Sequence, residues 1–117
     1  MEFTFTFIKL FYYGLGLASP LLISLMVFIV ILGQIVRARE KWTKLDALYW
    51  SFITATTVGY GDFRPVAPLS KFLAVLIAFT GIIFTGIFVA LALNAANIAF
   101  EGSIDKAEMK EQIKQLQ

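Results

Sequence analysis

The stretch Thr56-Thr57-Val58-Gly59-Tyr60-Gly61-Asp62 decides how the rest of this chain is interpreted. Glycine adopts left-handed backbone conformations at little steric cost, and it stands here at alternate positions. A backbone that alternates in this way can point successive carbonyl oxygens towards one axis, which a helix or a strand cannot do. Val58 and Tyr60 would then pack away from the axis, and the Thr57 hydroxyl could add one more oxygen below the carbonyls. The stretch therefore predicts a row of oxygen ligands.

Two long apolar runs flank this stretch, from Leu10 to Val36 and from Phe72 to Phe100. Hydrophobic residues make up 59% of the 117 residues, whereas globular chains average about 45–50%. Uncharged runs of this length are what a bilayer core requires. The chain has no cysteine and no histidine, which excludes disulfides, thiolate or imidazole metal sites and His-based catalysis. The composition predicts a membrane protein that is not an enzyme, and the net charge of +2 is too small to suggest nucleic acid as a partner.

A short helix is expected immediately before the glycine-containing stretch. Thr43-Lys44-Leu45-Asp46 matches a capping box and predicts a helix over residues 44–56. At 1.5 Å per residue this helix is only about 20 Å long, so it reaches part-way through a bilayer. Helix ends at that depth are tolerated only where protein or a water-filled cavity satisfies them. We therefore expect a re-entrant helix whose negative dipole end faces a dehydrating cation.

The flanking elements are expected as follows. Ser19-Pro20 is typical of a helix start and predicts an outer helix over 20–36; the alternative is an earlier start with a kink at Pro20. Residues 1–19, rich in phenylalanine, are expected to form an interfacial segment. Pro68 would begin an inner helix over 68–100, and the charged residues 101–117 would form a solvated cytoplasmic helical tail.

With these elements in order, the chain resembles the two-transmembrane, pore-loop tetrameric potassium channels of the bacterial type, over roughly residues 20–100. In that family four loops of this sequence surround an axis, and their carbonyls replace the water around K⁺. The resemblance implies an all-α membrane protein: two transmembrane helices flank a re-entrant pore helix and a selectivity filter at residues 57–61, in a fourfold-symmetric homotetramer. Thr57, Val58, Gly59 and Tyr60 would bind the permeating K⁺, with Gly61 completing the filter and no cofactor needed.

Further positions around the filter take their expected roles from the resemblance. Tyr49, Trp50 and Ile53 would support the filter from the pore helix. Some relatives have an acid where this chain has Ile53, so Asp62 lacks a carboxyl partner and should be held by donors of Tyr49 or Trp50, or by water. Arg64 would stand at the outer mouth, where relatives with an aromatic residue bind external tetraethylammonium; four arginines should repel it.

The inner helix carries the residues expected to gate and line the pore. In the family a glycine at the position of Gly81 bends during opening. The alternative is that Gly81 only permits close helix packing; the two interpretations weigh equally there, and packing is favoured for Gly86. Thr85, Val89 and Leu93 would line the cavity below the filter. No acid occurs on this helix before residue 101, which argues against strong inward rectification.

The resemblance also implies a multi-pass protein of the cell membrane with both termini cytoplasmic, but the basic residues conflict with this topology. The positive-inside rule places Lys and Arg on the cytoplasmic side. Outside would lie Arg37, Arg39, Lys41, Lys44, Arg64 and Lys71, and inside only Lys9, Lys106, Lys110 and Lys114. We expect the topology that the resemblance implies, with both termini cytoplasmic. A weakly selective cation channel, a pore-loop potassium transporter and a non-conducting scaffold subunit stay open as alternative functions, and a regulatory domain or subunit absent from this chain stays open as a partner.

Overall fold

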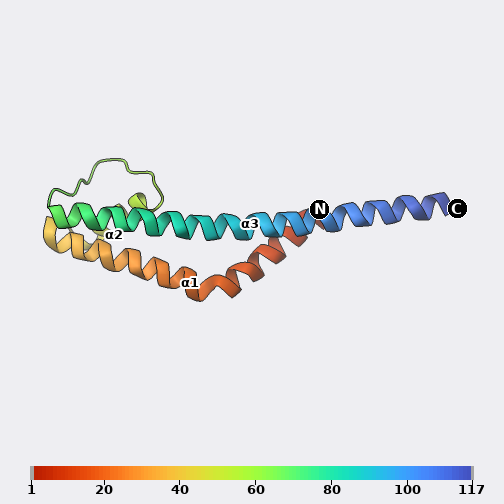
Figure 1. The fold of residues 1–117 in the computed structure, drawn as a ribbon, viewed down its shortest axis with the longest axis horizontal. Coiled ribbons are helices and arrows are strands. Elements are labelled where there is room, and N and C mark those ends of the chain that lie inside the picture. Colours follow the sequence, from red (N-terminus) through yellow and green to blue (C-terminus); the bar gives the residue numbers. More distant parts are fainter. Residues whose placement is uncertain (1, 117) are drawn as a thin grey trace. The chain divides into compact units, whose positions relative to one another are not determined.

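The computed structural model describes residues 2–116, and this part of the chain folds into three helices (Figure 1). Helix α1 spans Glu2–Glu40, α2 spans Lys44–Ala55 and α3 spans Pro68–Leu116. Helices α1 and α3 are long and apolar enough to cross a membrane, and only 17% and 22% of their most apolar windows is buried within the chain. The core helix of a soluble protein would be mostly buried, so these exposed apolar faces fit lipid or partner chains.

The start of α1 corrects the expected outer helix. The helix is already formed at Glu2 and runs through Pro20, so the helix start expected at residue 20 is wrong and the alternative of an earlier start holds. The interfacial position expected for residues 1–19 stays a prediction. Met1 lies outside the described residues. Proline lacks an amide hydrogen, which would leave the carbonyl of Gly16 without its helical donor. The hydroxyl of Ser19 donates to this carbonyl at 2.8 Å. A neighbouring side chain thus replaces the missing backbone bond.

The phenylalanines near the N-terminus follow helical spacing. The ring centroids of Phe3 and Phe7 lie 6.3 Å apart and those of Phe7 and Phe11 lie 5.8 Å apart, both pairs stacked. Phe11 also contacts Phe88 of α3 edge-on at 5.1 Å. Positions four residues apart share one helix face, so these three phenylalanines form a stripe along α1. This packing belongs to a compact unit formed by the residues up to Ser19 and those from Phe88 onward.

Helix α3 also differs from its expected length. It continues without a break from Pro68 to Leu116, so residues 68–100 and the tail are one helix and the predicted boundary at residue 100 is wrong. The tail contains no proline, and its lysines recur every four residues among acidic side chains, a pattern that supports a solvated helix. Lys106 donates to the Glu2 carboxylate at 3.3 Å, an exposed ion pair within the same compact unit.

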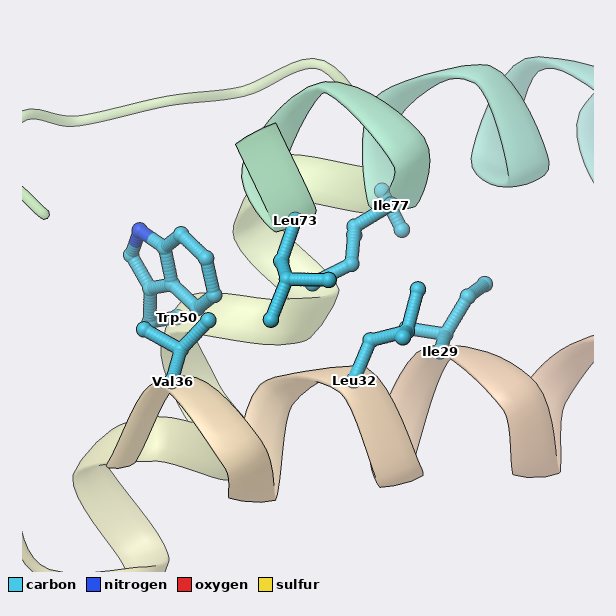
Figure 2. Packing of buried hydrophobic residues seen from close by; sticks show 7 residues of the cluster. Ile29, Leu32, Val36, Trp50, Leu73 and Ile77 are labelled. Atoms are coloured by element: carbon cyan, nitrogen blue, oxygen red, sulfur yellow. The ribbon is translucent and has the colours of Figure 1, made fainter. Parts of the chain in front are cut away.

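The second compact unit comprises Pro20–Ile87 and contains all of α2. Its core is small and draws on all three helices, as Figure 2 shows. The buried residues of this cluster are Ile29, Leu32 and Val36 of α1, Trp50 and Ala55 of α2, and Leu73 and Ile77 of α3. Between helices in lipid the driving force is close van der Waals contact, which small residues permit. Gly33 of α1 accordingly meets the Ser51 side chain of α2, where a Cβ would lie only 3.0 Å from the Ser51 Cβ.

Candidate functional site

Helix α2 presents the glycine-containing stretch at its C-terminal end. Its N-terminus follows the predicted capping box: the Thr43 side chain accepts the amide hydrogen of Asp46 at 3.1 Å. The helix ends at Ala55, one residue earlier than expected, and Thr56 caps it. The Thr56 hydroxyl turns back and donates to the Phe52 carbonyl at 2.6 Å. The short helix therefore has a defined beginning and a defined end.

The backbone that follows Thr56 is hydrogen-bonded to two carbonyls in the last turn of α2. The amides of Val58 and Gly59 both donate to the carbonyl of Ile53, at 3.0 and 3.2 Å, and the amide of Thr57 donates to the carbonyl of Thr54 at 3.1 Å. Ile53 thus contacts the predicted filter through its backbone oxygen. Because these amides face α2, the first part of the stretch is held against the end of the helix.

The backbone of the stretch alternates in handedness. Gly59 has a φ of 52° and Gly61 a φ of 81°, as the sequence predicts, and Thr57 also has a positive φ of 66°. Positive φ is uncommon for a residue other than glycine, so Thr57 is a strained position that the sequence did not reveal. Val58 and Tyr60 are 49% and 70% exposed, so the described residues provide only part of the outward packing expected for them.

The segment after the glycines is anchored by aromatic rings. The ring of Phe63 packs edge-on against those of Trp42 and Tyr49, with centroids 5.4 and 6.3 Å away. Trp42 also contacts Trp50 of α2 at 5.3 Å. The hydroxyl of Tyr49, one of the two donors expected to hold Asp62, interacts with its carboxylate. The Asp62 carboxylate also accepts the neighbouring amide of Phe63 at 3.1 Å.

Glu40 links the end of α1 to the beginning of α3. One oxygen of its carboxylate accepts the amides of Val66 and Ala67, at 2.6 and 2.9 Å. These donors immediately precede Pro68, the first residue of α3, so the carboxylate occupies the positive end of the helix dipole. Glu40 follows the apolar run of α1, and the hydrogen bonds from Ala67 and then Val66 hold the pKa of its carboxyl below the usual range. No local sequence pattern indicates this role of Glu40, because its partners lie more than twenty positions away.

The arginine expected at the outer mouth folds back onto the stretch. The Nε of Arg64 donates to the carbonyl of Gly61 at 3.1 Å. A Cβ added to Gly61 would lie 3.4 Å from an Arg64 nitrogen, so the guanidinium covers one face of that glycine. Arg64 is exposed.

The two glycines of α3 have different surroundings. Gly81 is buried against the backbone of Ala55 at the end of α2, and an added Cβ would lie 2.6 Å from the Ala55 Cα. Gly86 has nothing within 4 Å of such a Cβ. Gly81 is therefore a position where α2 and α3 pack closely, whereas Gly86 has no such neighbour among residues 2–116.

The residues expected to line a cavity fall into two groups. Thr85 borders a mostly apolar hollow of about 50 Å³ inside the second compact unit. Val89 and Leu93 are exposed and belong to the other compact unit. The hollow is lined by Met26, Ile29, Phe52, Ala55, Thr56, Gly81, Phe84 and Thr85.

Comparison with known proteins identifies a single family across this region. The family model described as "Ion channel" (Ion_trans_2) matches residues 21–97, which contain α2, the glycine stretch and most of α3. No solved structure matches the chain.

Several curated proteins are similar to the chain over shorter stretches. A protein named two pore potassium channel b, from Oryza sativa subsp. japonica, is 37% identical over 81 residues, which are 69% of this chain and 23% of that protein. A voltage-gated potassium channel from Aeropyrum pernix is 51% identical over 37 residues, 32% of this chain and 12% of that protein. Potassium voltage-gated channel subfamily A member 5 from Homo sapiens is 33% identical over 63 residues, 54% of this chain and 10% of that protein. The chain spans about a quarter or less of the length of these relatives.

Proposed function

Because the chain belongs to the ion channel family Ion_trans_2, as a two-transmembrane, pore-loop potassium channel domain, we propose that it forms a potassium-selective pore that conducts K⁺ passively across the cell membrane. The observation that carries this proposal is the alternating backbone of the stretch Thr57–Gly61, with positive φ at Thr57, Gly59 and Gly61. Such alternation is what a row of inward-facing carbonyls requires. Four Thr-Val-Gly-Tyr-Gly loops are the established example of a filter that replaces the hydration shell of K⁺.

The length of α2 supports a re-entrant element. Its 12 residues extend about 18 Å, too short for a hydrocarbon core of about 30 Å. The end of α2 would lie near the bilayer centre, where its partial negative charge favours a cation. The carbonyl of Ile53 is the one that holds the start of the filter at this place.

A homotetramer supplies what a single chain lacks. One loop cannot surround an ion, and closed fourfold symmetry would place four copies of Thr57, Val58, Gly59 and Tyr60 around one axis. The exposed side chains of Val58 and Tyr60 would then pack against neighbouring pore helices. Successive weak sites along the axis would let ions repel one another forward, so that selectivity and rapid flow coexist. Lipid would cover the remaining apolar faces of α1 and α3, with both termini in the cytoplasm.

Ion flux into liposomes containing the purified protein tests this function. The wild-type protein should admit K⁺ and exclude Na⁺. The variant Gly61→Ala should lose selective flux, because alanine at a φ of 81° is strained, whereas Gly86→Ala lies in an open, regular helical position and serves as the matched control. Equal flux of K⁺ and Na⁺ through the wild type would indicate a weakly selective channel, and no flux would indicate a scaffold subunit; either result refutes the proposal.

A further inference from the structure

The contact between Arg64 and Gly61 places a positive charge on the last carbonyl of the filter. The Nε–H of Arg64 points at the Gly61 oxygen over a donor–acceptor distance of 3.1 Å. A hydrogen bond in which the donor is ionised is stronger than one between neutral groups. In the proposed pore, this carbonyl oxygen would be the first of the filter that an ion entering from outside meets.

The surrounding loop keeps the guanidinium in this position. The preceding side chain, Phe63, is packed between the rings of Trp42 and Tyr49, and the following amides of Val66 and Ala67 are bound by Glu40. Arg64 lies between these two attachments, with its own side chain exposed. The backbone that carries Arg64 is therefore held on both sides, and within the described residues its exposed side chain hydrogen-bonds only to the Gly61 carbonyl.

No acidic side chain competes for Arg64 within the described residues. The ion pair found in this part of the chain joins Lys106 to Glu2, in the other compact unit. Asp62, two residues away, accepts the amide of Phe63. The Gly61 carbonyl is thus the only hydrogen-bond partner of the Arg64 side chain among residues 2–116.

We propose that Arg64 is a tethered cation that competes with external K⁺ for the Gly61 carbonyl, and so sets the K⁺ concentration at which the outer end of the filter fills. This inference rests on the proposed function. An oxygen that already accepts an N–H offers less electron density to K⁺, and the adjacent charge repels the ion. K⁺ must therefore displace the guanidinium before it binds, and the pore should conduct poorly at low external K⁺.

A simpler effect must be separated from this competition. Four arginines near the mouth would repel cations over a distance even without touching the carbonyls, and added salt would screen that repulsion. Displacement from a contact at 3.1 Å depends on the geometry of the guanidinium, which lysine does not reproduce. Arg64→Lys keeps the charge, and Arg64→Met removes both the charge and the donor while keeping a side chain of similar length.

Conductance of the purified channel in planar bilayers, measured against external K⁺ at constant ionic strength, tests the proposal. The K⁺ concentration for half-maximal conductance should fall about fivefold in Arg64→Met, the scale of one net hydrogen bond, and Arg64→Lys should show most of that fall. Arg39→Met removes another exposed basic residue without a filter contact and should leave the value unchanged. A wild-type value in Arg64→Met, or in Arg64→Lys, would overturn the proposal, the latter in favour of long-range repulsion. Absence of any K⁺ current in the wild type would overturn the proposed function itself.

A spectroscopic measurement reports on the carbonyl directly. With the Gly61 carbonyl carbon isotopically labelled, its NMR resonance should differ between the wild type and Arg64→Met at low K⁺, and the two should converge as K⁺ saturates the filter. Identical resonances at low K⁺ would overturn the proposal.

Discussion

Replacing Gly81 by alanine should separate α3 from the end of α2. Both Gly81 and Ala55 are buried, and the added Cβ would lie 2.5 Å from the carbonyl carbon and 2.6 Å from the Cα of Ala55. Ordinary contacts of this kind are about 1 Å longer. The atoms that the added Cβ meets are backbone atoms of Ala55, so no side chain can rotate away and one of the two helices must shift.

The size of the effect follows from two opposing terms. Alanine is favoured over glycine inside a helix by about 0.8–1.0 kcal/mol. Overpacking a well-packed core costs about 1–3 kcal/mol, and the backbone contact places Gly81 at or above the upper end of that range. We expect a net destabilisation of about 2 kcal/mol per chain. Gly86→Ala meets nothing within 4 Å, so it should be neutral or stabilising by up to about 1 kcal/mol.

Thermal dissociation of the proposed tetramer in detergent, followed by size-exclusion chromatography, compares the two variants. Gly81→Ala should dissociate at a clearly lower temperature than the wild type, and Gly86→Ala at the same or a higher temperature. If Gly81→Ala is as stable as Gly86→Ala, the packing argument is refuted. A variant of unchanged stability whose channels open less often would point to the hinge role instead.

The remaining predictions concern the loop and the topology. Glu40→Gln should destabilise the connection between α1 and α3. Because the pKa of the Glu40 carboxyl is lowered in the fold, the stability of the wild type should also decline as pH falls through that lowered pKa. Thermal unfolding at several pH values checks both effects, and a wild-type stability that does not change with pH would count against the link. Ile53→Glu should alter the decay of current during sustained opening by placing a carboxyl behind the filter, and an unchanged decay in patch recordings would show that this side chain does not govern filter stability. External tetraethylammonium should block the wild type weakly and Arg64→Tyr strongly, as a dose–response curve will show; strong block of the wild type contradicts this. Lys41 should react with a membrane-impermeant amine reagent added outside the cell. If Lys41 is protected from this reagent, the opposite topology is indicated.

Much of the fold could be predicted because it depends on local chemistry. The capping box at Thr43 placed the start of α2 correctly, since a cap involves residues only three positions apart. The positive φ of Gly59 and Gly61 followed from the conformational freedom of glycine alone. Prediction failed at Pro20, where a helix start was expected, because the outcome depended on whether the hydroxyl of Ser19 could replace a lost backbone donor.

The sequence by itself determined that two apolar helices flank a short helix and an alternating glycine loop, because hydropathy, capping and glycine dihedrals act over a few residues. The tertiary structure alone decided which residues hold that loop. The Glu40 carboxylate accepts the amides of Val66 and Ala67, and Gly81 packs against the backbone of Ala55. These partners are separated by 26 residues or more in the sequence. No periodic pattern in the sequence predicts such pairs, because they form only when the three helices pack. Packing brings distant donors and acceptors together, and it places a glycine without a side chain against another helix.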